Sequence, residues 1–154
     1  MTLPVPGLEF LAHVEVELGE LLDLGVTDAG HRRIVPIVGG TVTGERFTGV
    51  VLPGGADWQV VHDDGAVTID TRYTLRADDG ALVHIRTNGV RSGPRAVLDA
   101  LGRGEDVDPS AYYFRVTATF ETAAPQHRWM TRVLTVAVAR RRASTVVYDA
   151  YTVT

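Results

Sequence analysis

The sequence predicts an all-β protein with a single domain, residues 1–154, folded as one antiparallel β-barrel of about eight to ten strands. Three observations lead to this prediction. Apolar and polar residues alternate with a period of two along most of the chain, which is the pattern of a half-buried strand. Turn residues separate these runs at short intervals. Only one short segment, near 94–102, has the pattern of a helix.

The N-terminal part of the chain predicts strands joined by glycine-rich turns. The first run alternates from Leu8 to Leu18, and a short apolar stretch with turn residues follows it. The next run ends at Gly39-Gly40, and Gly44-Glu45 forms the turn of a hairpin that closes at Pro53-Gly54-Gly55. The strands expected in this part are Leu8–Leu18, Arg32–Val38, Thr41–Thr43 and Arg46–Leu52.

The rest of the chain predicts a meander interrupted by the helix. Asp63-Asp64-Gly65 and Asp78-Asp79-Gly80 lie between alternating runs, and Asp-Gly is a strong hairpin signal. For the helix, Ser92 can act as the cap and Pro94 suits the first turn. Long final strands favour a closed barrel, because closure leaves no unpaired edge. The further strands expected are Trp58–His62, Ala66–Arg76, Ala81–Thr87, Ala111–Glu121, Arg128–Ala139 and Ser144–Val153.

Two of these strands indicate what the interior could hold. Each has an apolar face, and Tyr73 lies on that face in one strand and Tyr112 in the other. One interpretation is an ordinary apolar core with a solvated polar exterior. The other is that interior hydroxyls and rings line a cavity, since a small barrel can hold one small ligand. Buried tyrosine hydroxyls need partners, so Tyr73 and Tyr112 are the first candidates for such a lining.

The composition excludes several kinds of chemistry. The chain has 15 Lys+Arg against 19 Asp+Glu, giving a net charge of −4, and every cation is an arginine. Without lysine or cysteine there is no Schiff base, thiol nucleophile, disulfide or P-loop. No serine lies in a Gly-x-Ser-x-Gly motif. The mild acidity argues against nucleic acid as a partner, and no apolar run approaches the length of a membrane span.

We expect no metal and no cofactor. The histidines are isolated, without His-x-His or His-Glu-x-x-His spacing, although residues distant in sequence can still converge. The start of the chain lacks the pattern of a signal peptide, and together with the absence of cysteine this predicts a cytoplasmic protein. The Arg140-Arg141-Arg142 run is interpreted as a solvated hairpin loop, with a contact to an anion or partner as the alternative.

The segment from Arg32 to Trp58 is the richest in unusual features. Its two Gly-Gly pairs need special backbone geometry or the close approach of another group. Asp57 and Trp58 directly follow the second pair and Ala56. A carboxylate beside an indole offers a general base next to an apolar wall, which could raise its pKa. The alternative is that Asp57 caps a turn and Trp58 closes one end of the barrel.

At these residues the chain resembles a known family. The resemblance covers nearly the whole chain, in order, and is to the domain-of-unknown-function 3237 family. It implies a single-domain β-barrel protein of bacteria and fungi and brings no settled activity. It points to Arg33, Asp57, Trp58, Arg72 and Tyr73 as site residues. The motifs that carry it are Arg-Arg-Ile-x-Pro-Ile-x-Gly-Gly, Val-Leu-Pro-Gly-Gly-Ala-Asp-Trp, Asp-x-Arg-Tyr at Asp70–Tyr73, Tyr-Tyr-Phe-Arg at Tyr112–Arg115 and Phe-Glu-Thr at Phe120–Thr122.

The functional prediction is a cofactor-independent enzyme that takes a small, partly aromatic or polyketide-like molecule into the barrel. It would perform cyclisation, isomerisation, elimination or addition by acid–base chemistry, without a covalent nucleophile. Asp57 would be the general acid or base, Arg33 would hold a carboxylate or enolate oxygen, and Tyr73 would donate a proton. The substrate-binding residues would be Trp58, Arg72, Tyr112 and Trp129.

The same sequence features fit two alternatives. One is a non-catalytic barrel that carries or senses a similar ligand, and the other is a structural or oligomerisation module whose glycine motifs serve the fold alone. A strongly shifted acid in a cavity would favour the enzyme, and a solidly packed interior would favour the structural module. Exposed Val and Tyr on the long last strands would also allow a homodimer.

Overall fold

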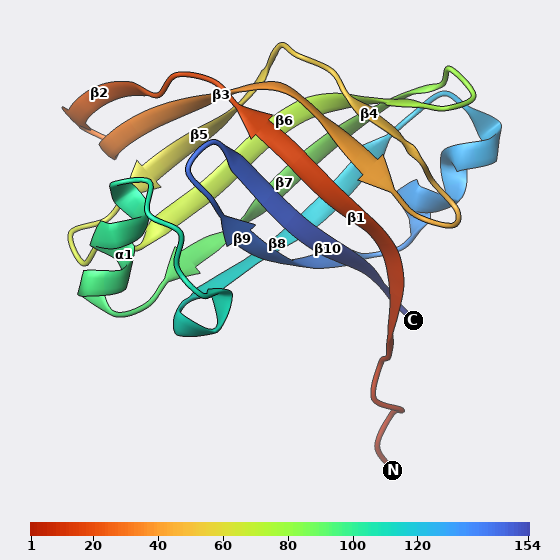
Figure 1. Ribbon diagram of the computed structural model, residues 1–154. Coiled ribbons are helices and arrows are strands. Elements are labelled where there is room, and N and C mark those ends of the chain that lie inside the picture. Colours follow the sequence, from red (N-terminus) through yellow and green to blue (C-terminus); the bar gives the residue numbers. More distant parts are fainter.

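The computed structural model describes all 154 residues, and its ten strands form a single sheet that closes into the predicted all-β barrel (Figure 1). One α-helix, α1, and two 3-10 helices, η1 and η2, complete the chain. None of its helices has the length and apolarity needed to cross a bilayer. The elements are β1 Leu8–Leu18, β2 Leu22–Thr27, β3 Gly30–Thr43, β4 Gly49–Val51, β5 Gly55–Val61, β6 Val67–Ala77, β7 Leu82–Ser92, α1 Arg95–Gly102, η1 Pro109–Ala111, β8 Tyr113–Glu121, η2 Pro125–Arg132, β9 Thr135–Arg141 and β10 Thr145–Val153.

Pairing of β1 with both β10 and β3 closes the barrel. From β10 the sheet runs through β9, β8 and β7 to β6, and every pairing is antiparallel. The last gap, between β6 and β3, is filled by two short strands at different heights, β4 and β5. Strand β2 pairs only with β3 and extends past the barrel wall (Figure 1).

The interior has one half that is packed with apolar side chains. It lies toward the end where η2 closes the barrel, on the side opposite to α1 (Figure 1). Phe47 and Met130 are each 3% exposed there, and Leu75 and Ile85 are fully buried beside them. The strict alternation of β6 and β7 produces this core, because every second side chain points inward.

The Gly-Gly pairs allow strands to approach each other closely. A Cβ on Gly40, whose φ is +142°, would lie 2.0 Å from the carbonyl oxygen of Glu15 in β1. A Cβ on Gly55 would lie 2.3 Å from the carbonyl oxygen of Arg72 in β6. Both contacts are too short for any larger residue. Gly55 therefore fixes the position of β5, and with it Asp57, against β6.

Several details differ from the sequence prediction. Ser92 does not cap the helix: it ends β7, and the cap position is Pro94 without a side-chain hydrogen bond. The strand expected over Arg128–Ala139 begins only at Thr135, because Pro125 starts the 3-10 helix η2 and Met130 of that helix is buried in the core. The segment after β1 is not only a turn, since Leu22–Thr27 forms β2.

Candidate functional site

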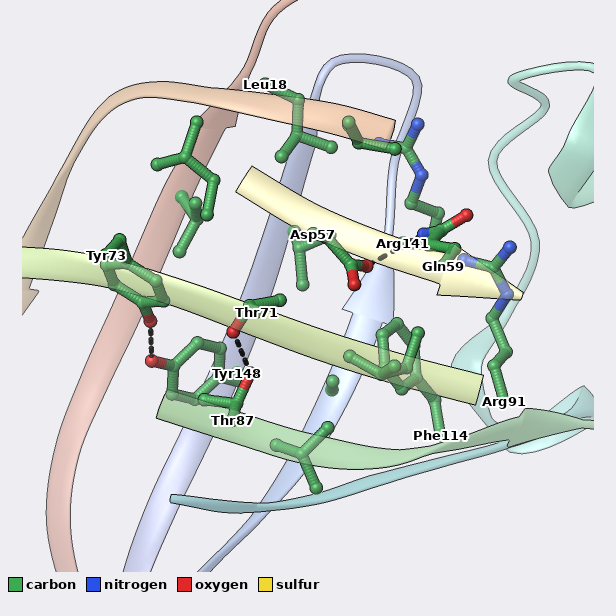
Figure 2. A pocket seen from close by; sticks show the side chains of 17 residues that line it. Leu18, Asp57, Gln59, Thr71, Tyr73, Thr87, Arg91, Phe114, Arg141 and Tyr148 are labelled. Atoms are coloured by element: carbon green, nitrogen blue, oxygen red, sulfur yellow. Dashed lines mark hydrogen bonds between the residues drawn. The ribbon is translucent and has the colours of Figure 1, made fainter. Parts of the chain in front are cut away.

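The half of the barrel near α1 holds a cavity lined by side chains from strands all around the barrel (Figure 2). Its volume is about 40 Å³. One water molecule needs about 10–15 Å³ on the same scale, so the cavity has room for a few waters or for a small part of a larger molecule. Most of its lining is apolar. The polar lining residues are Asp57, Gln59, Thr71, Tyr73, Thr87, Arg91, Arg141 and Tyr148.

Asp57 is the one carboxylate in this cavity. Strand β5 places it opposite Thr71 of β6, and its residue is 7% exposed. Its Oδ2 accepts a hydrogen bond from Gln59 Nε2 at 2.8 Å, and its Oδ1 accepts one from the backbone N–H of Asp70 at 3.1 Å. Burial raises the pKa of Asp57 above its usual value, although both hydrogen bonds and the charge of Arg91 act against the shift.

Two tyrosines meet across the barrel at the inner end of the cavity. The hydroxyls of Tyr73 in β6 and Tyr148 in β10 form a hydrogen bond, and both side chains are buried (Figure 2). Burial raises the pKa of both phenols, so both are neutral at physiological pH. Tyr148 also borders the apolar half of the interior. The pair therefore lies between this cavity and the apolar core.

Two arginines occupy the opposite end of the cavity, near Gln59 (Figure 2). Arg91 lies near the end of β7 and is 4% exposed, and its Nε and Nη1 have no hydrogen-bond partner. Burial and the neighbouring Arg141 lower the pKa of Arg91 to about 10. Arg141 ends β9, and burial together with the nearby Arg33 lowers its pKa as well. This end of the cavity is therefore strongly positive.

The structure brings together two of the residues proposed as catalytic, Asp57 and Tyr73, in one cavity. Arg33 pairs in register with Gln59, which points inward, and so has the interior orientation. Its charge lowers the pKa of Arg91 and Arg141, which places it close to them. It lines an outer hollow that shares Arg91 with the cavity, and not the cavity itself.

The residues expected to bind substrate lie elsewhere. Trp58 and Arg72 line a groove on the outer face of the barrel, together with Asp70. Trp129 belongs to η2, where the guanidinium of Arg46 lies 3.5 Å from the centroid of its ring.

Tyr112 is buried in the core, 6% exposed, and its hydroxyl accepts a hydrogen bond from the backbone N–H of Arg141 at 3.0 Å. Tyr112 therefore supports the strand that carries Arg141, and its side chain does not line the cavity.

No sequence motif pointed to Gln59, Arg91 or Tyr148, and the prediction of a solvated loop at Arg141 was wrong. That residue is not in a solvated loop, because it ends β9 with its side chain in the cavity. A signal was available in the alternation of the strands. Arg91 has the same parity as the inward residues Val83 and Ile85, and an arginine in that register is unusual.

No three or more His, Asp or Glu side chains come together in the arrangement of a metal site. The arrangement that does exist is a buried carboxyl with a raised pKa, a neutral phenol pair and a group of cations, all within or beside one small cavity. A carboxyl of this kind can take up and return a proton, and guanidinium groups can hold an oxygen on which negative charge develops.

Comparisons with known proteins point to one family. A family model described as "Protein of unknown function (DUF3237)" matches residues 6–153. A UPF0311 protein of Clostridium acetobutylicum is 44% identical over 122 residues, 79% of this chain and 77% of the relative. A UPF0311 protein of Rhodopseudomonas palustris is 38% identical over 150 residues, 97% of this chain and 98% of the relative.

The similarity extends to the fold and to more distant fungal proteins. A crystal structure of a conserved protein of unknown function from Rhodopseudomonas palustris, 37% identical, has a TM-score of 0.94 and covers 99% of this chain and 100% of its own. A protein of Penicillium herquei named hydroalkoxylation enzyme phnH is 24% identical over 128 residues, 83% of this chain and 70% of the relative.

Proposed function

Because this chain belongs to the DUF3237 family, whose description names no activity, we propose a function from its own site: a cofactor-independent enzyme that uses Asp57 to move a proton on a small organic substrate. The observation that carries the proposal is the state of Asp57. Its carboxyl is buried in the cavity, its pKa is raised, and both oxygens are held by hydrogen-bond donors. A carboxyl whose pKa is shifted toward neutrality can act as base and then as acid within one turnover.

The reaction class that fits best is the addition of a hydroxyl group across a carbon–carbon double bond conjugated to a carbonyl, or its reverse. Asp57 accepts the proton of the attacking hydroxyl while its oxygen bonds to the β-carbon. The carbonyl oxygen then carries the negative charge of an enolate, which the guanidinium of Arg141, whose side chain also lines the cavity, would stabilise. Asp57 returns the proton to the α-carbon, so every atom is accounted for and no cofactor is consumed.

The distant fungal relative supports this class. Hydroalkoxylation is the addition of an alcohol across a carbon–carbon double bond, and phnH of Penicillium herquei carries that name. Tyr73 supplies a further hydrogen-bond donor, because its pKa is raised well above 10 and its hydroxyl stays protonated. Asp57 and Tyr73 line the same cavity in this chain.

The size of the cavity determines how a substrate would bind. About 40 Å³ accommodates the reacting atoms only, and not a complete polyketide-like molecule. The outer hollow that shares Arg91 has a volume of about 330 Å³ and is lined by Arg33, Leu98 and other residues of the α1 end. A larger substrate would place its reactive part beside Asp57 and the rest of its skeleton in this hollow.

The experiment uses a panel of ketones that carry a conjugated double bond and a free hydroxyl, 2′-hydroxychalcone among them. Spontaneous ring closure gives a racemic product, so chiral chromatography separates the enzymatic product from the background. We expect an enantiomeric excess with the wild-type protein and a loss of at least about a hundredfold in rate with Asp57→Asn. Asp28→Asn, at an exposed turn, is the matched control. Equal enantioselective turnover by wild type and Asp57→Asn would remove Asp57 from the mechanism.

A non-catalytic carrier or sensor is the second candidate. The unpaired Nε and Nη1 of Arg91 favour it, since such donors can bind an anionic ligand without any reaction. A carrier would bind members of the same panel without converting them, and Asp57→Asn would leave that binding unchanged. The carrier is excluded if the wild-type protein converts any member of the panel and Asp57→Asn does not.

A further inference from the structure

We propose that Arg33, Arg91 and Arg141 form a binding site for the carboxylate group of the substrate, so that the natural substrate is an organic acid with an apolar skeleton. We call these three residues the arginine cluster. The inference rests on the proposed function, because it names the class of molecule that would reach Asp57. The ends of β7 and β9 and the first half of β3 carry the three side chains to the same end of the barrel.

The cluster has no carboxylate partner of its own. The arginines that form salt bridges are Arg86, Arg95, Arg103 and Arg140. Within the cluster, Nε of Arg33 and both Nε and Nη1 of Arg91 are buried without any hydrogen-bond acceptor. Buried donors in proteins are almost always paired, so a group of unpaired charged donors beside a cavity is suited to binding an anion.

The surrounding acids do not neutralise this charge. Asp57 is the nearest interior carboxyl, but its oxygens are already engaged by Gln59 and by a backbone N–H, and burial disfavours its charged form. Asp23 lies near Arg33 in the neighbouring strand, and it bonds instead to His31 at 2.7 Å. The end of the cavity therefore keeps a net positive charge that an anionic ligand would balance.

The chemistry of the lining selects the kind of anion. A planar guanidinium matches a planar carboxylate through two parallel hydrogen bonds. Apolar side chains, Ile69 and Phe114 among them, line most of the adjacent cavity, whereas the outer hollow is lined mainly by polar and charged residues. An inorganic anion would leave these surfaces exposed to water. A carboxylate whose unsaturated or aromatic part enters the cavity would cover them while its head group pairs with Arg91.

The test measures binding of trans-cinnamate and of its neutral isostere trans-cinnamamide to the full chain, by calorimetry at pH 7 and low ionic strength. We expect cinnamate to bind about tenfold or more tightly than the amide. Arg91→Gln should remove this preference, and Arg141→Gln should reduce it. The matched control is Arg76→Gln, an exposed arginine on the outer face of β6, which should retain it.

Equal affinity for the acid and the amide would overturn the inference. A loss of affinity in Arg76→Gln as large as that in Arg91→Gln would also overturn it, since only general charge would then be involved. Circular dichroism confirms that each variant is folded, and Arg141→Gln serves if Arg91→Gln is not. Asp57→Asn separates the two proposals, because it should still bind cinnamate while losing turnover. If Asp57→Asn retains turnover, only the proposed function is refuted. If the wild-type protein binds cinnamate and cinnamamide equally, only this inference is refuted.

Discussion

Replacement of Arg91 by methionine should stabilise the ligand-free protein. Arg91 is 4% exposed, and two of its nitrogens have no hydrogen-bond partner. Burial and the charge of Arg141 lower its pKa from 12.5 to about 10. A depression of that size corresponds to about 3 kcal/mol acting against the charged form in the folded state. Methionine fills much of the same space, adapts its shape and carries no charge.

Part of this gain is offset by contacts that the variant loses. The guanidinium of Arg91 lies 5.6 Å from the centroid of the Phe114 ring, and such a contact contributes about 0.5–1 kcal/mol. It is also attracted to Asp57. The net expectation is a gain of about 1–2 kcal/mol in the free energy of unfolding, as observed when other buried ions are replaced by apolar residues. For a domain of this size the corresponding rise in Tm is about 2–8 °C.

The assay is scanning calorimetry with urea unfolding at pH 7, for wild type, Arg91→Met and the exposed control Arg76→Met. The control should change the free energy of unfolding by less than about 0.5 kcal/mol. A marked loss of stability in Arg91→Met relative to the control would refute the reasoning, because it would mean that protein groups already satisfy the guanidinium. Saturating cinnamate should raise the Tm of the wild type and leave that of Arg91→Met unchanged.

Three further predictions concern neighbouring residues. Because the pKa of Asp57 is raised in the folded state, its contribution to the free energy of unfolding is fully present below about pH 3.8, where the unfolded carboxyl is also protonated, and is lost as the pH rises through the folded pKa. Asp57→Asn should therefore have a higher free energy of unfolding than wild type at pH 7. Urea unfolding at lower pH should show that this difference becomes smaller. Tyr148→Phe leaves the hydroxyl of Tyr73 unpaired and should cost about 1–3 kcal/mol, part of which the double phenylalanine variant recovers in a double-mutant cycle. Gly55→Ala puts a Cβ 2.3 Å from the carbonyl oxygen of Arg72 and should lower the free energy of unfolding by about 1–3 kcal/mol; an unchanged urea midpoint would show that β5 is not held so closely.

The fold was predictable because it depends on local patterns. Alternation identified β6 and β8, and the Asp-Gly turn at Asp79-Gly80 identified the hairpin between β6 and β7. The prediction failed at Pro125–Arg132, where apolar residues belong to a 3-10 helix that closes the barrel. Over so few residues, a cluster of apolar side chains does not distinguish a strand from a short helix.

The candidate site was predictable only in part, and the reason is again the alternation of strands. Trp58 and Arg72 are adjacent in sequence to Asp57 and Tyr73, and a motif analysis groups such neighbours together. Successive residues of a strand point to opposite faces of the sheet, so two neighbours in sequence cannot both point into the cavity. Asp57 and Tyr73 point inward, and Trp58 and Arg72 line the outer groove.

The arginine run illustrates the same point at the end of β9. Arg140 pairs with Asp106 outside the barrel at 2.9 Å, while Arg141 lines the cavity. Composition alone suggested one solvated loop, because it gives no information on where the last strand residue lies. The convergence of Arg91 and Arg141 also depends on the order of strands around the barrel, which no local segment specifies.

The tyrosine pair sets a fixed depth for anything that enters the barrel. Beyond the linked hydroxyls of Tyr73 and Tyr148 the interior leaves only about 20 Å³ among apolar side chains, so a guest molecule can lengthen only outward, toward α1. The distance from the tyrosine pair to the arginine cluster therefore limits how many atoms can lie between the acid group of a substrate and its reactive carbon. Substitutions near α1 would change which outer parts of a substrate are accepted without moving the tyrosine pair or the arginine cluster. The packed half of the interior would keep the barrel folded.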